Sequence, residues 1–194
     1  MTGDYTVHPL TPDRWADFES LFGPRGAYGG CWCMWWRMTQ TEFNQRQGEP
    51  NKQAFQAIVQ KGNPPGLLAY HDDKAVGWCA VAPRESYSRF ERSRVLRPID
   101  EQPVWSITCF YVAKGYRRKG ITRELVRAAI DYVRDQGGHI VEAYPVEPRK
   151  EQAPDIYMYT GVARMFKALG FVEITRRSDT RPIMRYMLDQ GEQP

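Results

Sequence analysis

The sequence lacks any long apolar run, and its first residues do not combine a basic segment with an apolar one. A membrane-spanning helix needs about 20 consecutive apolar residues, so we expect neither a membrane span nor a secretory signal. Cysteine is scarce, with four residues in a chain of 194. Such scattered thiols do not suggest a disulfide framework, and we expect a reduced, cytoplasmic protein.

The chain lacks a large excess of one charge, because its basic residues are dispersed among nearly as many acidic ones. The 27 basic and 23 acidic residues are interspersed and leave a net charge of +4. A nucleic-acid-binding surface would need segregated basic residues, so we expect no nucleic-acid partner. Cys31 and Cys33 lie close together, but no second Cys/His pair follows at zinc spacing, which predicts no metal site.

No internal repeat or low-complexity segment divides the chain. We therefore interpret residues 1–194 as a single domain, with residues 189–194 as a frayed tail. The length allows an ample hydrophobic core, and the mild positive charge suits a polyanionic small ligand.

A strand followed by a helix is the most distinct pattern in the sequence. Residues Val104–Val112 are rich in β-branched and aromatic side chains, which is typical of a buried strand. Apolar residues then recur at steps of three and four and predict the buried face of a helix that ends before Gly137: Ile121, Leu125, Ala128, Ala129, Tyr132 and Val133.

The link between this strand and helix is short and basic and contains Gly120. The first N–H groups of a helix have no partner inside it, and the helix dipole adds partial positive charge there. Arg117, Arg118 and Lys119 add full charges, and a glycine lets a ligand approach the backbone. The segment therefore predicts an anion site, best suited to phosphate, whereas an ordinary solvated turn is the alternative.

The linker does not match the P-loop of nucleotide triphosphatases or the dinucleotide-binding glycine pattern. Its order of Val112, Arg117, Gly120 and Leu125 instead resembles the pyrophosphate loop of the GNAT superfamily of acyl-CoA-dependent N-acetyltransferases. That loop reads Arg/Gln-x-x-Gly-x-Gly/Ala after a strand that ends in valine. Thr122 stands where the family usually has glycine or alanine.

The rest of the chain follows the order of elements in that superfamily. The resemblance implies an α/β fold with a mixed, mostly antiparallel central sheet, one parallel, splayed strand pair, and helices on both faces. The predicted segments are a strand at 4–10, helices at 11–22 and 43–61, a hairpin at 66–82, an irregular excursion at 83–102, a strand at 139–146, a helix ending at Leu169, and strands at 171–174 and 184–188.

The resemblance also implies acetyl-CoA as co-substrate, with its pantetheine arm along the central strand and an N–H near Val112 facing the thioester oxygen. The implied cofactor-binding residues are Phe110, Tyr111, Val112, Arg117, Arg118, Lys119, Gly120, Ile121, Thr122, Arg123 and Phe166. Phe166 occupies the position at which the family usually has a tyrosine as general acid, and phenylalanine has no proton to donate.

Several carboxylates and tyrosines are candidates for proton transfer, and Glu142 and Tyr159 are the leading ones. Glu142, on the strand beside the splayed pair, is a candidate base, although it could equally satisfy a neighbouring arginine; Glu147 and Asp155 are weaker candidates. Tyr159 is the candidate acid in place of Phe166. Three other tyrosines could take the same role or simply pack: Tyr111, Tyr144 and Tyr157.

An aromatic stretch after the first helix is a candidate acceptor site. Its members are Tyr28, Trp32, Trp35 and Trp36, which could form a pocket wall, an aromatic plug of the core, or a base-stacking surface. We expect a small-molecule amine as acceptor, with a protein N-terminus also open, and a homodimer only by analogy. A non-catalytic CoA-binding or regulatory module of the same fold is the alternative to an enzyme.

Overall fold

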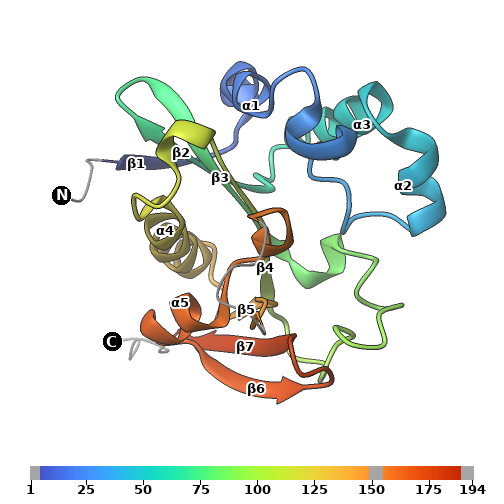
Figure 1. Ribbon diagram of the computed structural model, residues 1–194, viewed down its shortest axis with the longest axis vertical. Helices are drawn as coiled ribbons and strands as arrows, with labels where there is room; N and C mark the ends of the chain where they lie inside the picture. Colours follow the sequence, from blue (N-terminus) through green and yellow to red (C-terminus); the bar gives the residue numbers. More distant parts are fainter. Residues whose placement is uncertain (1–4, 149–154, 189–194) are drawn as a thin grey trace.

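The computed structural model describes residues 5–148 and 155–188, without the side chains of residues 155 and 156. Its centre is a seven-stranded sheet in the order β1-β2-β3-β4-β5-β7-β6 (Figure 1). Only β4 and β5 pair in parallel; every other neighbouring pair is antiparallel. The strands are β1 (Tyr5–Pro9), β2 (Gly66–His71), β3 (Lys74–Pro83), β4 (Trp105–Val112), β5 (Ile140–Ala143), β6 (Val172–Arg176) and β7 (Pro182–Met187).

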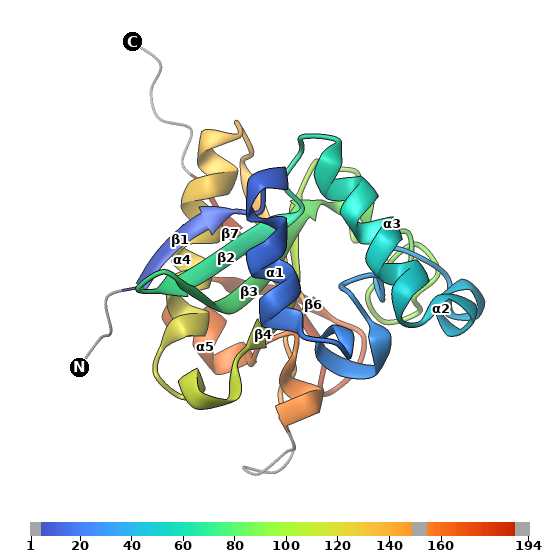
Figure 2. The same cartoon turned by 90° about the horizontal axis from the view of Figure 1, so that it is seen from above.

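Helices cover both faces of this sheet, so the predicted fold class is confirmed. On one face lie α4 (Ile121–Asp135) and α5 (Ala163–Ala168), packed on alternate residues of β2, β3 and β4. On the other face lie α1 (Trp15–Phe22) and α3 (Glu49–Gln60). Figure 2 shows α1 crossing the sheet on the face opposite α4. Successive side chains of each buried strand therefore point alternately into the two cores.

The helix α4 follows the predicted period closely. Its buried positions include Ile121, Leu125, Ala129 and Val133, and these pack into the core against the sheet. The helix ends one residue before the expected limit, at Asp135, and Gly137 follows with φ of +73°. That left-handed conformation is the one that glycine adopts without strain just past a helix.

The single helix predicted for residues 43–61 is wrong, because the chain breaks at Gly48. Two helices occupy the segment: α2 (Gln40–Arg46) and α3. Gly48 has φ of +86°, and Pro50 stands in the first turn of α3, where its missing N–H costs nothing. A capping box between Thr39 and Glu42 begins α2. The sequence contains this signal, but the prediction followed the apolar spacing and missed it.

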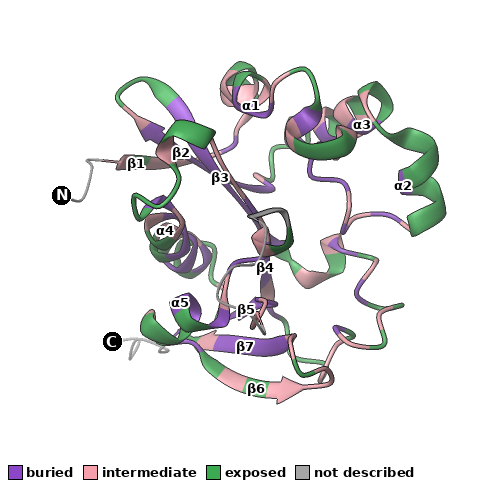
Figure 3. Cartoon of the chain, viewed as in Figure 1, coloured by how far each residue is buried: buried purple, intermediate pink, exposed green. Residues whose placement is uncertain are grey.

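The excursion between β3 and β4 is folded onto the protein. Its buried residues Tyr87, Phe90 and Leu96 form a third core with Trp36 and Tyr144. Figure 3 shows this segment as mostly intermediate and exposed, with a few buried positions among them. Arg177 fastens it from the β6–β7 side, donating hydrogen bonds to the main-chain oxygens of three of its residues, Val95, Arg97 and Pro98. We therefore expect the excursion to hold its shape.

None of the helices in the described ranges is both long and apolar enough to cross a membrane. In the same part of the chain, no group of three or more His, Cys, Asp or Glu side chains could hold a metal ion. Cys33 has a packing role instead, since its sulfur accepts a hydrogen bond from the indole N–H of Trp78 at 3.3 Å.

Candidate active site

The strands β4 and β5 part after three paired positions. Pairing runs from Trp105 opposite Val141 to Ile107 opposite Ala143 and then ends, although β4 continues to Val112. Because backbone groups alternate along a strand, the N–H and C=O of Phe110 and Val112 point away from β3 toward the opened side. This opening is the predicted splayed pair, and we call it the β4–β5 gap.

Two groups already contact the backbone that borders the β4–β5 gap. The N–H of Phe110 donates a hydrogen bond to the carbonyl of Tyr159 at 2.6 Å. The carbonyl of Val112 accepts one from Nε of Arg117 at 3.1 Å. Three residues were predicted to border the pantetheine arm. The N–H of Phe110 is already hydrogen-bonded, and the N–H and C=O of Tyr111 point toward β3. Val112 keeps its N–H toward the gap.

The basic linker forms a tight turn that ends at the first residue of α4. Arg118 has φ of +61° and Gly120 has φ of +88°, and no side chain caps the helix. Among the described residues, the amides from Arg118 to Thr122 have no main-chain acceptor. A Cβ built on Gly120 would have no atom within 4 Å, so the backbone there is open to a ligand.

The side chains around this turn are mostly exposed and positively charged. Arg117, Arg118, Lys119 and Arg123 all reach solvent, whereas Ile121 is buried and offers only its backbone. Exposed N–H groups at a helix N-terminus, surrounded by cations, form an anion site that suits the two phosphates of a diphosphate. The structure thus places the predicted loop residues together at one end of the β4–β5 gap.

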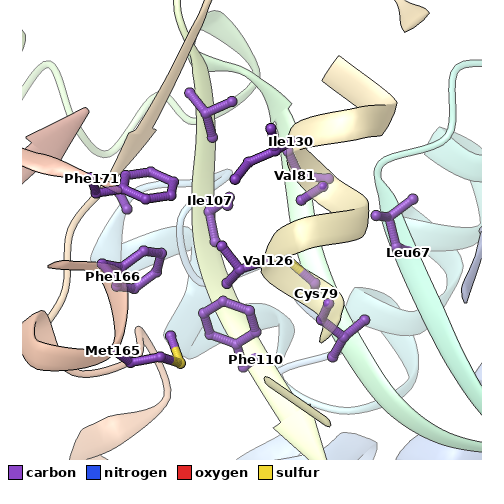
Figure 4. Packing of buried hydrophobic residues seen from close by; sticks show 14 of the residues in the cluster. Leu67, Cys79, Val81, Ile107, Phe110, Val126, Ile130, Met165, Phe166 and Phe171 are labelled. Carbon is purple, nitrogen blue, oxygen red and sulfur yellow. The ribbon is translucent and has the colours of Figure 1, made fainter. Parts of the chain in front are cut away.

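Phe166 lies inside the core. Its side chain is fully buried, 4.9 Å from the ring centroid of Phe171 and 6.2 Å from that of Phe110. Figure 4 shows Phe166 among Phe171, Met165 and Phe110 on the α5 side of β4. A direct contact between this ring and a cofactor would require the core to open, so its position favours packing over the predicted binding role.

Tyr159 stands beside the β4–β5 gap with its side chain half-buried. Burial raises the pKa of its hydroxyl to about 12, so the group holds its proton at neutral pH. Of the other tyrosines considered, Tyr144 is buried and donates to Glu142 at 2.5 Å, and Tyr157 is 65% exposed. Tyr111 packs 5.4 Å from the ring of Phe22.

Both carboxylate oxygens of Glu142 are occupied. Its Oε1 accepts from the hydroxyl of Tyr144, and its Oε2 accepts from Nε of Arg185 at 2.7 Å. Arg185 in turn donates from both Nη atoms to Asp100 at 2.7 and 2.8 Å. Glu142 is 1% exposed, so this contact favours the alternative in which it satisfies an arginine.

The two weaker candidates for the base are Glu147 and Asp155. Glu147 forms an ion pair with Arg176 at 2.5 Å and lies 3.9 Å from the ammonium of Lys167, with 41% of its side chain exposed. The side chain of Asp155 lies outside the described residues. Neither position adds an argument for a base.

The four aromatic residues of the predicted acceptor site do not form one wall. Trp32 is buried and stacks on Phe22, and Trp36 is buried and stacks on Phe90, so both are core residues. Tyr28 is 70% exposed. Trp35 alone is half-buried; it packs, as Tyr159 does, against the third core, with the guanidinium of Arg89 above its ring.

Two arginines near Tyr159 were not predicted as site residues. Arg89 lies in the excursion and Arg181 precedes β7, and the charges of both lower the pKa of Tyr159 against the larger effect of burial. In the sequence they look like solvated residues of two unrelated loops. No spacing could have linked them, because only the folded chain brings the loops together.

A sequence profile described as the acetyltransferase (GNAT) family matches residues 32–171 of the chain. Curated protein sequences gave no match. Solved structures that share the fold include three bacterial proteins. One is an acetyltransferase from Listeria monocytogenes described as GNAT family, with TM-score 0.59 and 8% identity over 96% of each chain.

The second is a protein from Salmonella typhimurium described as an acetyltransferase and solved with its cofactor acetyl-CoA. It has TM-score 0.55 and 17% identity over 98% of this chain and 97% of its own. The third is the ribosomal-protein-S5-alanine acetyltransferase of Vibrio fischeri, with TM-score 0.55 and 17% identity over 96% of this chain and 94% of its own. At identities this low, the structural likeness shows the fold alone.

Proposed function

The chain belongs to the GNAT family of acetyltransferases, whose profile covers more than half of it, and from this premise we propose that it transfers an acetyl group from acetyl-CoA to the primary amine of a small molecule. Direct attack of the amine on the thioester, with both substrates bound, is the reaction that the site suits. The observation that carries the proposal is the juxtaposition of an amide-lined, cationic helix N-terminus with the β4–β5 gap.

The amides from Arg118 to Thr122 would hold the diphosphate of acetyl-CoA, and the surrounding basic side chains would balance its charge. A pantetheine arm that leaves this turn along β4 reaches the backbone of Val112. The N–H of Val112 is the donor suited to the oxygen of the thioester as negative charge develops there.

Tyr159 is the proton donor in this proposal. When the C–S bond breaks, the neutral hydroxyl of Tyr159 donates a hydrogen bond and then its proton to the leaving thiolate; because Tyr159 is the weaker acid, the transfer is completed when the proton that the amine releases returns through water to Tyr159. The help required is modest, since an ordinary thiol has a pKa of about 8.5 and its thiolate can leave unaided. The attacking amine must lose a proton, and a water chain in the gap would suffice for this step.

Two measurements test the proposal. Acetyl-CoA should raise the melting temperature more than a nucleotide that lacks the pantetheine arm, because a ligand that binds only the folded state stabilises it. Release of free thiol should then be followed across a library of amines. Binding of acetyl-CoA without thiol release from any amine would favour a non-catalytic CoA-binding module of the same fold.

A further inference from the structure

Arg89 is held in one orientation by three contacts. Its main-chain N–H donates to the carbonyl of Trp36 at 3.2 Å, and the carbon of its guanidinium lies 3.8 Å from the ring centroid of Trp35. Its Nη1 donates to the side chain of Gln40 at 3.0 Å. The other two nitrogens, Nε and Nη2, are buried and have no hydrogen-bond partner among the described residues. Burial lowers the pKa of Arg89 accordingly.

Those two nitrogens form one edge of the guanidinium plane. Their N–H bonds run side by side, in the geometry that binds both oxygens of a carboxylate. The protein uses the same edge elsewhere: Arg176 donates from Nε and Nη2 to the two oxygens of Glu173, each at 2.8 Å. Because a buried donor without an acceptor is costly, the corresponding edge of Arg89 suggests an acceptor that binds from outside.

A second cation, Arg181, also acts on Tyr159. Arg181 is half-buried, and its one hydrogen bond to a described side chain is a long contact of 3.4 Å from Nη1 to the hydroxyl of Thr160. Burial lowers the pKa of Arg181, and Tyr159 interacts electrostatically with both arginines. The carbonyl of Tyr159 binds the N–H of Phe110, so the backbone of Tyr159 borders the β4–β5 gap, and both charges act on the side chain of that residue.

We infer that the acceptor of the proposed acetyl transfer is an amine that also carries a carboxylate, such as an amino acid, and that Arg89 and Arg181 bind this carboxylate beside Trp35. The inference rests on the proposed function for the role of the amine. Two desolvated cations would repel a polyamine, so the site selects by charge as well as by hydrogen bonds.

Calorimetric titration of the protein saturated with CoA tests the carboxylate site without needing turnover. The probes are amino acids paired with their decarboxylated amines: phenylalanine and phenethylamine, leucine and 3-methylbutylamine, tryptophan and tryptamine. We expect at least one acid to bind roughly 30-fold more tightly than its amine, the ratio typical of a buried charge pair. Equal or weaker binding of the acids in all three pairs would overturn the inference.

Variants locate the site. Arg89→Gln and Arg181→Gln should each remove the preference for the acid, whereas Arg92→Gln, an exposed arginine of the same excursion, should leave it intact. Arg89→Lys keeps the charge but loses the paired edge and should bind the acid weakly. Circular dichroism shows whether each variant is folded. A preference that survives both glutamine substitutions in folded protein would also contradict the assignment.

Thiol release with the same pairs separates the two proposals. Acids that bind but release no thiol, together with no release from any amine of the library, would sink the acetyl-transfer proposal and leave the carboxylate site standing. Decarboxylated amines that react as fast as their parent acids would preserve acetyl transfer and refute the carboxylate site.

Discussion

The N–H of Phe110 and the carbonyl of Tyr159 are joined by a hydrogen bond of 2.6 Å. This bond ties the turn before α5 to the edge of β4, where the parallel pairing with β5 has ended. It places the backbone of Tyr159 beside the Val112 N–H, on the strand that leads to the basic turn. It also means that Val112, rather than Phe110, offers a hydrogen-bond donor to a thioester without the loss of an existing bond.

Replacing Gly120 with Asp should abolish the binding of acetyl-CoA. The new carboxylate would project from the amide-lined turn and repel a diphosphate, although it would meet no protein atom. We expect the affinity for acetyl-CoA, measured by calorimetry, to fall by about 100-fold or more, because the introduced charge has the same sign as the diphosphate.

The matched control is Gly137→Asp at the other end of α4. Gly137 also has positive φ and an open Cβ direction, so it shares the backbone strain, which costs about 1 kcal/mol. Gly120→Asn carries the same shape without charge and should bind more weakly than the wild type but better than the aspartate. Unchanged affinity in Gly120→Asp would show that the diphosphate binds elsewhere.

Tyr159→Phe should lower the rate of acetyl transfer while leaving acetyl-CoA affinity unchanged. A positioned general acid typically contributes about 100-fold or more to a rate, and because a thiolate can also leave unaided we expect a smaller loss, about 10-fold. Because the pKa of Tyr159 is raised to about 12, the hydroxyl stays protonated through neutral pH, and its ionisation should limit the wild-type rate only in strongly alkaline solution. That alkaline limb should disappear in the variant. Tyr157→Phe, at an exposed position, is the control and should behave as wild type.

Glu142→Gln should destabilise the protein. The substitution removes the charge that Arg185 meets in the interior, and breaking a buried pair costs about 3 kcal/mol, which a lower urea midpoint would report. Glu173→Gln, in a more exposed ion pair with Arg176, should cost less than about 1 kcal/mol. If Glu142 were instead the catalytic base, stability would hold while the rate fell and the acidic limb of the pH profile vanished.

Acid should weaken the contact between Asp100 and Arg185. Hydrogen bonds from Arg185 hold the pKa of Asp100 below its usual value. A carboxyl group with a lowered pKa in the folded state adds stability at higher pH, and loses it as pH falls through that value, below about pH 4. The difference in urea midpoint between wild type and Asp100→Asn should therefore be large at pH 7 and shrink toward pH 3. A difference that is the same at both pH values would contradict this account.

The sequence by itself determined the strand, basic turn and helix around Gly120, because each depends on local chemistry: β-branched residues, an unpaired helix start, and apolar residues at helical spacing. It also indicated the parallel pair, since a strand, helix and strand in succession return in the same direction. The single helix predicted across Gly48 was wrong because the apolar spacing of two short helices continued across the break.

Only the tertiary structure decided which polar and aromatic residues meet. Whether Glu142 faced a substrate or an arginine depended on Arg185, which lies on another strand and is paired in register with it. Likewise, Trp32, Trp35 and Trp36 read alike in sequence, but different partners bury two of them and leave the third beneath Arg89. Contacts between distant segments carry no periodic signal, so a site built from them emerges only when the chain has folded.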